Sequence, residues 1–598
     1  MRPLVYVDSE AALAEARRDG LIPEDAEIRS FAPALNGRPG IARADKDVTP
    51  AHIRALEKAV LAASTAMYRD YAERPDEALV LARACIAELS MMAYHALALS
   101  DEDCDRDLRV IGIGFANREY ALRIGPPFAM LTGPGHPFGL IEIDEGRISG
   151  IDQPAPTVAP IWTRLTFASR TSLGYRFAAK ISRALGRSGP KGSILVIREN
   201  ELLKDTAFAL AKRGFAIHLL RYPTVTEAEA VAAAPRLDDR FVSCIQDCLR
   251  AALPERVAAL VARGFKGRAE RALGRYRVLS DKLSDAIGAM SHLRPQGILS
   301  NVKFEAEAVA IRTAAQRKRL PNFVFSHGFA AETSEREVAY HARHENALGD
   351  VSFVFTKTAK ETLDRNPMRV GDCAAVGLSS EYARRRMSRP PAGLPPVWYI
   401  STALYNGTMP IMCVGYTDNQ IADYEKDVVR NVLAPLPHRV MYKAYPAYRY
   451  IDPDPVLTLA AAQPNIELYL DRIDLRYIVS KARIFVTSRA TSTMSLCLFS
   501  GRPTIFIDHP DQVPLRDDAR AAFRDGAFLI DARNPDWQDE ARALLSRPLE
   551  DIENAWREKD AARRDLIRRF FSDPLDGHAG RRAADIIRNR IQTIQASR

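Results

Sequence analysis

The sequence has few cysteines, and their spacing suits neither a metal site nor a disulfide framework. It contains 7 Cys among 598 residues, with no C-x-x-C pair and no zinc-type arrangement. Cys244 and Cys248 lie four residues apart in SCIQDCL, a spacing that more often packs on one helix face than binds a metal. We therefore expect no bound metal and a reducing, cytoplasmic environment.

Long apolar runs are also missing. No segment approaches the roughly 18 unbroken apolar residues of a membrane span. The first residues, MRPLVYVDSE, lack the apolar core of a signal peptide. We expect neither a membrane span nor a secretory leader, and the hydrophobic content of 47% is ample for more than one folded core.

The sequence has little net charge for its length. The 84 basic and 75 acidic residues leave a formal charge of +9, a mild excess. No nucleic-acid-binding motif is present, so we expect no nucleic-acid partner. Two basic clusters, at 383–390 and 561–571, could contact anionic lipid or phosphate. That would place the chain peripherally at the inner membrane; the alternative is that both clusters are ordinary solvated faces.

What the sequence does contain is a repeated alternation of strand-like and helix-like segments. Residues 192–380 and 397–510 each show several β-branched runs separated by amphipathic stretches, the pattern of parallel sheets covered by helices. The predicted fold class is α/β, with two doubly wound Rossmann-like domains and an additional N-terminal α/β domain. The predicted divisions are an accessory domain at 1–150, a connector at 151–188, Rossmann-like domains at 189–388 and 389–535, and a helical tail at 536–598.

In open parallel sheets, ligands bind beyond the carboxyl ends of the strands. One such position holds the hydroxyl-rich stretch FVTSRATSTMSLCLFSGRP, between a strand and a short helix. Ser488, Thr491 and Ser492 could hold a phosphate there, because a helix start offers free N–H groups and a partial positive charge. Ordinary helix capping is the alternative, and Ser495 and Ser500 suit plain helix positions.

A second strand end carries the stretch MYKAYPAYRYID, which presents Lys443, Tyr445 and Pro446 from one loop. A lysine ammonium suits a phosphate, and a tyrosine ring can stack or donate a hydrogen bond. A surface loop with partly covered aromatic rings is the alternative.

The third candidate is His327 in VFSHGF, at the end of a strand of the first Rossmann-like domain. Its near-neutral pKa suits a general base. A structural histidine is the alternative, and Glu332 and Glu335 just beyond are rival bases.

Taken together, residues 190–535 resemble a two-domain glycosyltransferase of the GT-B architecture. The segment 298–329 is similar to the strand–helix–strand–His-Gly segment of bacterial surface-polysaccharide transferases and CDP-glycerol-type polyol-phosphate transferases. The order YKAYP then TSRATSTMSLCLFSGRP resembles the paired motifs that hold CMP in bacterial sialyl-, polysialyl- and Kdo-transferases. By position, the resemblance assigns nucleotide binding to Lys443, Tyr445, Pro446, Ser488, Thr491 and Ser492. Tyr445 departs from the pattern, which usually has His there.

The resemblance implies an inverting glycosyltransferase of bacterial surface-glycan assembly, of capsule or lipopolysaccharide type, that needs no cofactor. Its partners would be a nucleotide-sugar donor, best a CMP-activated nonulosonic acid or Kdo, and a glycan or glycoprotein acceptor. The alternatives are an enzyme like UDP-N-acetylhexosamine 2-epimerase, a polyol-phosphate transferase, or a non-catalytic glycan-binding scaffold of the same fold.

Overall fold

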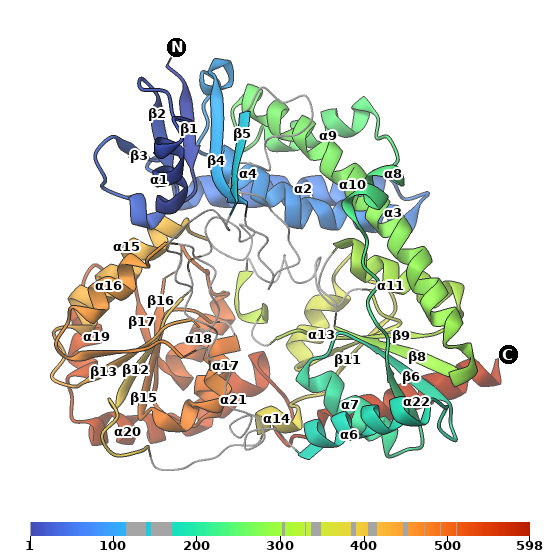
Figure 1. Ribbon diagram of the computed structural model, residues 1–598. Coiled ribbons are helices and arrows are strands. Elements are labelled where there is room, and N and C mark those ends of the chain that lie inside the picture. The colour runs from blue at the N-terminus through green and yellow to red at the C-terminus, as the bar shows by residue number, and fades with distance from the viewer. Residues whose placement is uncertain are drawn as a thin grey trace.

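The computed structural model describes residues 2–114, 139–144, 170–301, 305–328, 331–335, 348–383, 390–402, 404, 415–445, 452–471, 473–490, 492–509 and 511–597. Within these ranges the chain forms three parallel sheets with helices between successive strands, which confirms the predicted α/β class. Figure 1 shows the sheet of the N-terminal part above and the two six-stranded sheets side by side below it.

The N-terminal sheet has the strand order β3-β2-β1-β4-β5. Its helices α2, α3 and α4 form a long layer that continues away from the sheet, and a π-helical turn at Cys85–Leu89 joins α3 to α4. The elements are β1 (Leu4–Val7), α1 (Glu10–Arg18), β2 (Glu27–Ser30), β3 (Ile41–Arg43), α2 (Pro50–Asp70), α3 (Pro75–Ala84), α4 (Ser90–Ala96), β4 (Leu108–Gly114) and β5 (Gly139–Asp144).

The middle sheet has the order β11-β10-β9-β8-β6-β7 with all strands parallel, so the direction in which successive strands are added reverses between β6 and β8. The elements are α6 (Arg170–Leu185), β6 (Ser193–Ile197), α7 (Glu201–Ala211), β7 (Ala216–Leu219), α8 (Glu227–Ala232), α9 (Asp239–Leu249), α10 (Glu255–Ala289), β8 (Pro295–Ser300), α11 (Glu305–Arg317), β9 (Asn322–Phe325), β10 (Val351–Val354), α13 (Lys357–Asp364), β11 (Asp372–Ala375) and α14 (Ser380–Ala383). Helix α6 lies inside the segment predicted as a connector.

The third sheet has the order β14-β13-β12-β15-β16-β17, which is the 3-2-1-4-5-6 order of a Rossmann sheet, and its switch point lies between β12 and β15. The elements are β12 (Val397–Ile400), α15 (Asp418–Val428), β13 (Val440–Lys443), α16 (Pro455–Ala461), β14 (Ile466–Tyr469), β15 (Ile484–Thr487), α17 (Ser492–Phe499), β16 (Thr504–Asp508), α18 (Asp517–Gly526), β17 (Phe528–Asp531), α19 (Trp537–Leu545), α20 (Leu549–Glu558), α21 (Asp560–Phe570) and α22 (Ala579–Ala596).

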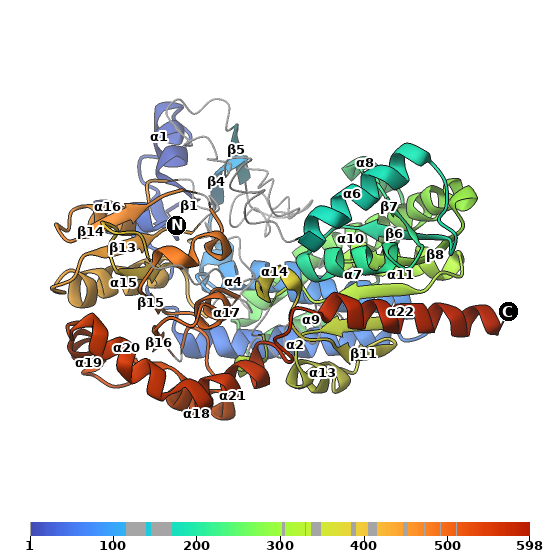
Figure 2. The same ribbon diagram turned by 90° about the horizontal axis from the view of Figure 1, so that it is seen from below.

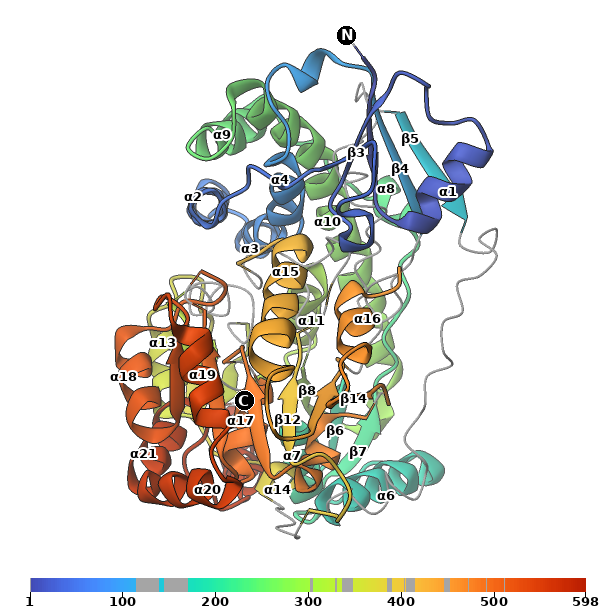
Figure 3. The same ribbon diagram turned by 90° about the vertical axis from the view of Figure 1, so that its left-hand side faces the viewer.

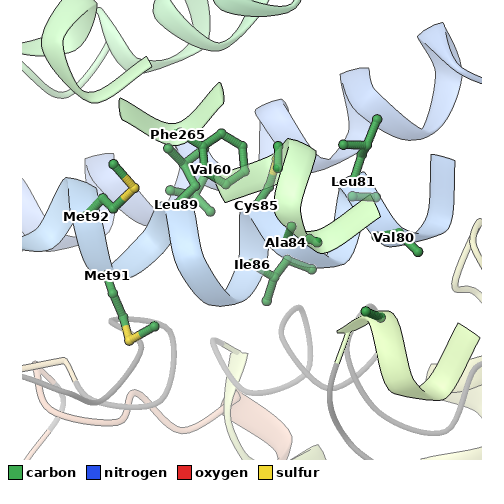
Figure 4. Packing of buried hydrophobic residues seen from close by; sticks show 14 of the residues in the cluster. Val60, Val80, Leu81, Ala84, Cys85, Ile86, Leu89, Met91, Met92 and Phe265 are labelled. Carbon is green, nitrogen blue, oxygen red and sulfur yellow. The ribbon is translucent and has the colours of Figure 1, made fainter. Parts of the chain in front are cut away.

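The N-terminal part shares most of its hydrophobic core with the middle domain, although a smaller cluster around β1, α1 and β2 lies within it alone. One continuous cluster joins α2, α3 and α4 to α9, α10 and α11 of the middle domain. Figure 4 shows Phe265 of α10 beside Val60 and Leu89 of the N-terminal helices. Ion pairs reinforce the junction, for example between Asp76 and Arg312. The helical layer therefore belongs to both parts of the chain.

The predicted helical tail crosses back to the middle domain. Helix α22 packs against α7, and its residues Ala583 and Ile587 join a core that includes Phe325 of the middle sheet and Met494 of the third domain. Figure 2 shows α22 running along the middle domain, while α19, α20 and α21 stay with the third domain. The tail thus links the two Rossmann-like domains.

One helical stretch, Pro75–Ala96, combines the length and apolar composition that a membrane span also has, with a mean hydropathy of 1.2. Within the folded protein, 94% of the most apolar window of this stretch is buried. Core helices of folded domains are buried in the same way.

Candidate functional site

The carboxyl end of β9 carries His327, which lies exposed at the edge of the middle sheet. Its Nδ1 lies 3.1 Å from Oδ1 of Asn301, and Nδ2 of Asn301 donates a hydrogen bond of 2.7 Å to the Phe325 carbonyl. The second bond fixes which way the amide faces, so the neutral imidazole carries its proton on Nδ1. Nε2 is then the basic nitrogen, which is the arrangement that a general base needs.

A second asparagine holds the same turn. Asn200 follows β6, caps α7 by accepting from the Leu203 amide, and donates a hydrogen bond of 2.7 Å to the Ser326 carbonyl. Asn200 and Asn301 therefore fix the backbone around His327 from the ends of the two strands at the switch point of the middle sheet. Our sequence analysis missed both, although Asn301 directly follows β8 and Asn200 lies three residues after β6.

The segment after His327 crosses to the third domain. Gly328 lies against Ser492, since a Cβ built on this glycine would be 3.9 Å from the Ser492 Cβ. Further along, Arg516 N donates 3.0 Å to the Thr333 carbonyl and Glu335 N donates 3.1 Å to the Pro514 carbonyl. The structure thus brings together the His327 turn and the start of α17, two candidates that are far apart in the sequence.

The rival bases Glu332 and Glu335 are placed by this same crossing. Glu332 belongs to a 3₁₀ turn at Ala331–Thr333, and its carbonyl accepts from Arg516. Glu335 is exposed. The contacts that define this segment involve its backbone, so neither glutamate is oriented toward His327 by them, and their role as bases stays a prediction.

Lys443 ends β13 and is buried, with 2% of its surface exposed. Its Nζ donates a hydrogen bond of 2.7 Å to the Ala444 carbonyl and lies 5.4 Å from the centre of the Tyr469 ring. Burial lowers the pKa of Lys443 to about 8, against the opposing pull of Asp474 and Asp471. A buried ammonium that is not fully neutralised favours an anionic ligand.

The turn after β15 is split between the interior and the surface. Ser488 is buried at 3% exposure, beside the phenols of Tyr399 and Tyr424. Ser492 is exposed and begins α17. Ser495 and Ser500 donate to the carbonyls of Ser492 and Cys497. Ser495 therefore occupies a helix position as expected, whereas Ser500 lies in the turn directly after α17.

Strand register puts this turn beside Lys443. Ile400 of β12 is paired with Lys443 on one side and with Thr487 on the other. The loops after β13 and β15 therefore open at the same edge of the sheet, on either side of its switch point. Of the remaining predicted nucleotide-binding residues, Tyr445 is 37% exposed, whereas Pro446 and Thr491 lie outside the described residues.

A buried glutamate that we did not predict is hydrogen-bonded to the carboxyl ends of β12 and β13. Glu425 of α15 accepts hydrogen bonds from the hydroxyls of Tyr399, Tyr442 and Thr402 at 2.7–2.8 Å. Burial raises the pKa of Glu425, although the three hydroxyls partly offset it. Because Tyr399, Thr402 and Tyr442 belong to the ends of β12 and β13, Glu425 fixes the backbone that presents Lys443.

Arg476 joins the two walls of the site. It lies in a 3₁₀ turn at Leu475–Tyr477, pairs with Asp474 at 3.0 Å, and reaches Glu201 of the middle domain at 3.3 Å. Burial alone would raise the pKa of Asp474, but Arg476 more than compensates and the pKa is lowered. The carboxylate of Asp474 is therefore ionised, and its negative charge favours the protonated form of Lys443.

Two further observations concern metal ligands and a cavity. In the part of the chain that the structure describes, no group of three or more His, Cys, Asp or Glu side chains could hold a metal ion. A cavity of about 570 Å³ lies between α6, α7 and the start of α22; none of the predicted site residues lines it.

The structure describes one of the two basic clusters, 561–571, and only the beginning and end of the other, 383–390. Most of 383–390 lies outside the described residues. In 561–571, Arg563 is buried against Trp556, Arg564 pairs with Asp560, and Leu566 and Phe570 are in the core. Its apolar residues are thus committed to the core, whereas Arg564, Arg568 and Arg569 are exposed, and contact of this cluster with a membrane stays a prediction.

No protein-family model matches this chain, and no curated protein matches it by sequence. Among solved structures, S. aureus MnaA with UDP is similar at 13% identity over 67% of this chain and 97% of that one, with a TM-score of 0.38. The UDP-GlcNAc 2-epimerase of Methanocaldococcus jannaschii gives 12% identity, 66% and 99% coverage, and 0.38. The lipopolysaccharide outer core galactosyltransferase WaaB gives 10% identity, 66% and 99% coverage, and 0.34.

Proposed function

We propose that this chain is a nucleotide-sugar-dependent glycosyltransferase that inverts the anomeric carbon by direct displacement. The observation that carries the proposal is the proximity of Gly328 to Ser492. This proximity supports a site in which His327 faces the start of α17, and strand register puts Lys443 at the same edge of the third sheet as that helix start. A base for the acceptor and a site for the departing phosphate are what such a displacement requires.

In the proposed reaction, Nε2 of His327 takes the proton from the acceptor hydroxyl while that oxygen bonds to the anomeric carbon. The bond from this carbon to the phosphate oxygen breaks, and the nucleotide leaves with the electron pair. Lys443 and the N–H groups at the start of α17 stabilise the negative charge on the phosphate. Asn301 is a positioning residue, because it keeps the proton of the neutral ring on Nδ1.

For the donor we propose a CMP-activated nonulosonic acid or Kdo, used in the cytoplasm to build a bacterial surface glycan on a glycan or glycoprotein acceptor. Support comes from the resemblance of the two segments that contain Lys443 and Ser488. The proposal needs no metal or cofactor, because Lys443 and the helix start would supply the positive charge at the phosphate.

Calorimetry with CMP, CDP, UDP and GDP, followed by hydrolysis of the matching sugar nucleotide, tests the proposal. We expect CMP to bind most tightly and the CMP-sugar to be hydrolysed slowly without acceptor. Tighter binding of UDP would keep the phosphate site but overturn the donor. Release of an epimerised sugar from UDP-N-acetylhexosamine would establish the epimerase alternative, and binding without any turnover would favour the scaffold.

A further inference from the structure

Helix α6 has two apolar faces, and only one of them is covered by the protein. Tyr175 and Ala179 pack into the core against α7 and β7. Leu173, Phe177, Ile181 and Leu185, spaced four residues apart, are exposed by 37%, 67%, 42% and 54%. Residues four apart share a helix face, so these four form one continuous stripe, which we call the α6 stripe.

The α6 stripe is unusual for this protein. Of the eight large apolar side chains that are exposed among the described residues, four belong to it. A fifth, Leu219, ends the edge strand β7, which packs against α6. Single exposed apolar residues need no explanation, but a contiguous apolar surface marks an interaction site.

The charge beside the α6 stripe has a single sign. Arg176, Lys180 and Arg183 are exposed and lie along one flank of the stripe by helical spacing, and Arg187 is exposed just beyond the end of α6. No aspartate or glutamate occurs in the sequence from 153 to 198. Long basic side chains next to an apolar stripe can lay their stems along an apolar layer while their charges reach a polar surface.

Carboxylates of the described elements around α6 do not neutralise this charge. Asp205 of α7 is occupied by hydrogen bonds from Thr171 and Ser380, and Asp576 is paired with Arg582. Asp585 of α22 pairs with Arg213. Figure 3 shows α6 along the lower edge of the molecule, away from the N-terminal helices that fill the core above.

We propose that the α6 stripe and its basic flank dock on an anionic lipid bilayer, with α6 lying in the plane of the interface. An apolar helix face bordered by Lys and Arg is what holds an amphipathic helix at the headgroup boundary. The excess of positive charge favours an anionic leaflet over a neutral one. This inference is independent of the proposed donor and base, because α6 contains none of the residues that would act on substrate.

Co-sedimentation of the full chain with vesicles tests the proposal without any substrate. We expect binding to vesicles that contain phosphatidylglycerol, weak binding to pure phosphatidylcholine, and loss of binding as ionic strength rises. Phe177→Ser with Leu185→Ser should weaken binding at least 10-fold, because two large apolar side chains no longer enter the acyl layer. Arg176→Gln, Lys180→Gln and Arg183→Gln together should weaken it about 100-fold at about 1 kcal/mol per charge.

Val231→Ser is the matched control, because Val231 of α8 is 54% exposed but lies outside the α6 stripe. It should leave vesicle binding unchanged, and all variants should keep the wild-type circular dichroism. Equal binding to neutral vesicles, no vesicle binding, or an equal loss in Val231→Ser would overturn the proposal. So would self-association that Phe177→Ser with Leu185→Ser abolishes in light scattering, since the stripe would then join two copies of this chain.

Discussion

Replacing Lys443 by methionine should change nucleotide affinity and stability in opposite directions. Burial lowers its pKa from 10.5 to about 8. At 1.36 kcal/mol per pKa unit, keeping the ammonium protonated in the fold near pH 7 costs about 3 kcal/mol. Methionine fills a similar volume without charge. After loss of the charge-assisted bond to the Ala444 carbonyl, worth about 1.5 to 3 kcal/mol, Lys443→Met should stabilise the protein by up to about 1.5 kcal/mol.

The same substitution should weaken binding of CMP roughly 10- to 150-fold, because a charge-assisted hydrogen bond contributes about 1.5–3 kcal/mol. The lowered pKa of Lys443 also determines how stability and nucleotide affinity change with pH. The unfolded chain binds the proton more tightly, so the stability penalty is fully present below pH 8 and disappears between about pH 8 and 10.5. Nucleotide affinity of the wild type should fall as pH rises through about 8, where free Lys443 loses its charge.

Calorimetry gives the affinity and thermal unfolding gives the stability of the same samples. Lys481→Met is the matched control, since Nζ of Lys481 lies 5.2 Å from the centre of the same Tyr469 ring; it should leave affinity unchanged. Unaltered CMP affinity in Lys443→Met, together with reduced stability, would show that Lys443 is a structural residue and would refute the reasoning.

The remaining predictions concern the other wall, the supporting glutamate, the turn and the shared core. His327→Ala should lower kcat roughly 10²- to 10⁴-fold with nearly unchanged nucleotide affinity; near-normal turnover would move the base to Glu332 or Glu335. Ser492→Ala should weaken CMP binding, and Ser488→Ala should weaken it further but less than additively; unchanged affinity in the double variant would reduce the hydroxyls to capping and packing. Glu425→Ala should destabilise the protein by about 1–3 kcal/mol or more, because it leaves buried hydroxyls without an acceptor, whereas Glu425→Gln should cost less; equal unfolding midpoints for the two would contradict this. A chain that starts at residue 186 should aggregate or bind a hydrophobic dye, because removing α2, α3 and α4 exposes Phe265 and its neighbours; a soluble, cooperatively unfolding product that binds nucleotide would restore the independent N-terminal domain.

The sequence determined the class of fold and the places where chemistry could occur. Strand-like runs alternating with amphipathic stretches indicated parallel sheets, and the positions of Lys443 and His327 at strand ends were read correctly. These signals are local: side-chain periodicity, Gly and Pro at turns, and polar residues after apolar runs. Asn200 and Asn301 carried the same strand-end signal, but their role depends on the carbonyls that their amides reach.

Tertiary structure alone decided which segments meet. Strand order places Ile400 between Lys443 and Thr487, and the crossing chain places Gly328 against Ser492; neither contact leaves a pattern in the intervening residues. The same holds for burial. The hydroxyls of Ser488 and Ser492 look alike in the sequence, but one faces the core and the other the surface. Helix α6 lay in a segment interpreted as a connector, and only its packing on α7 and β7 shows which of its apolar faces is covered. Periodicity states that a face is apolar, whereas the contacts that bury it come from residues distant in the chain.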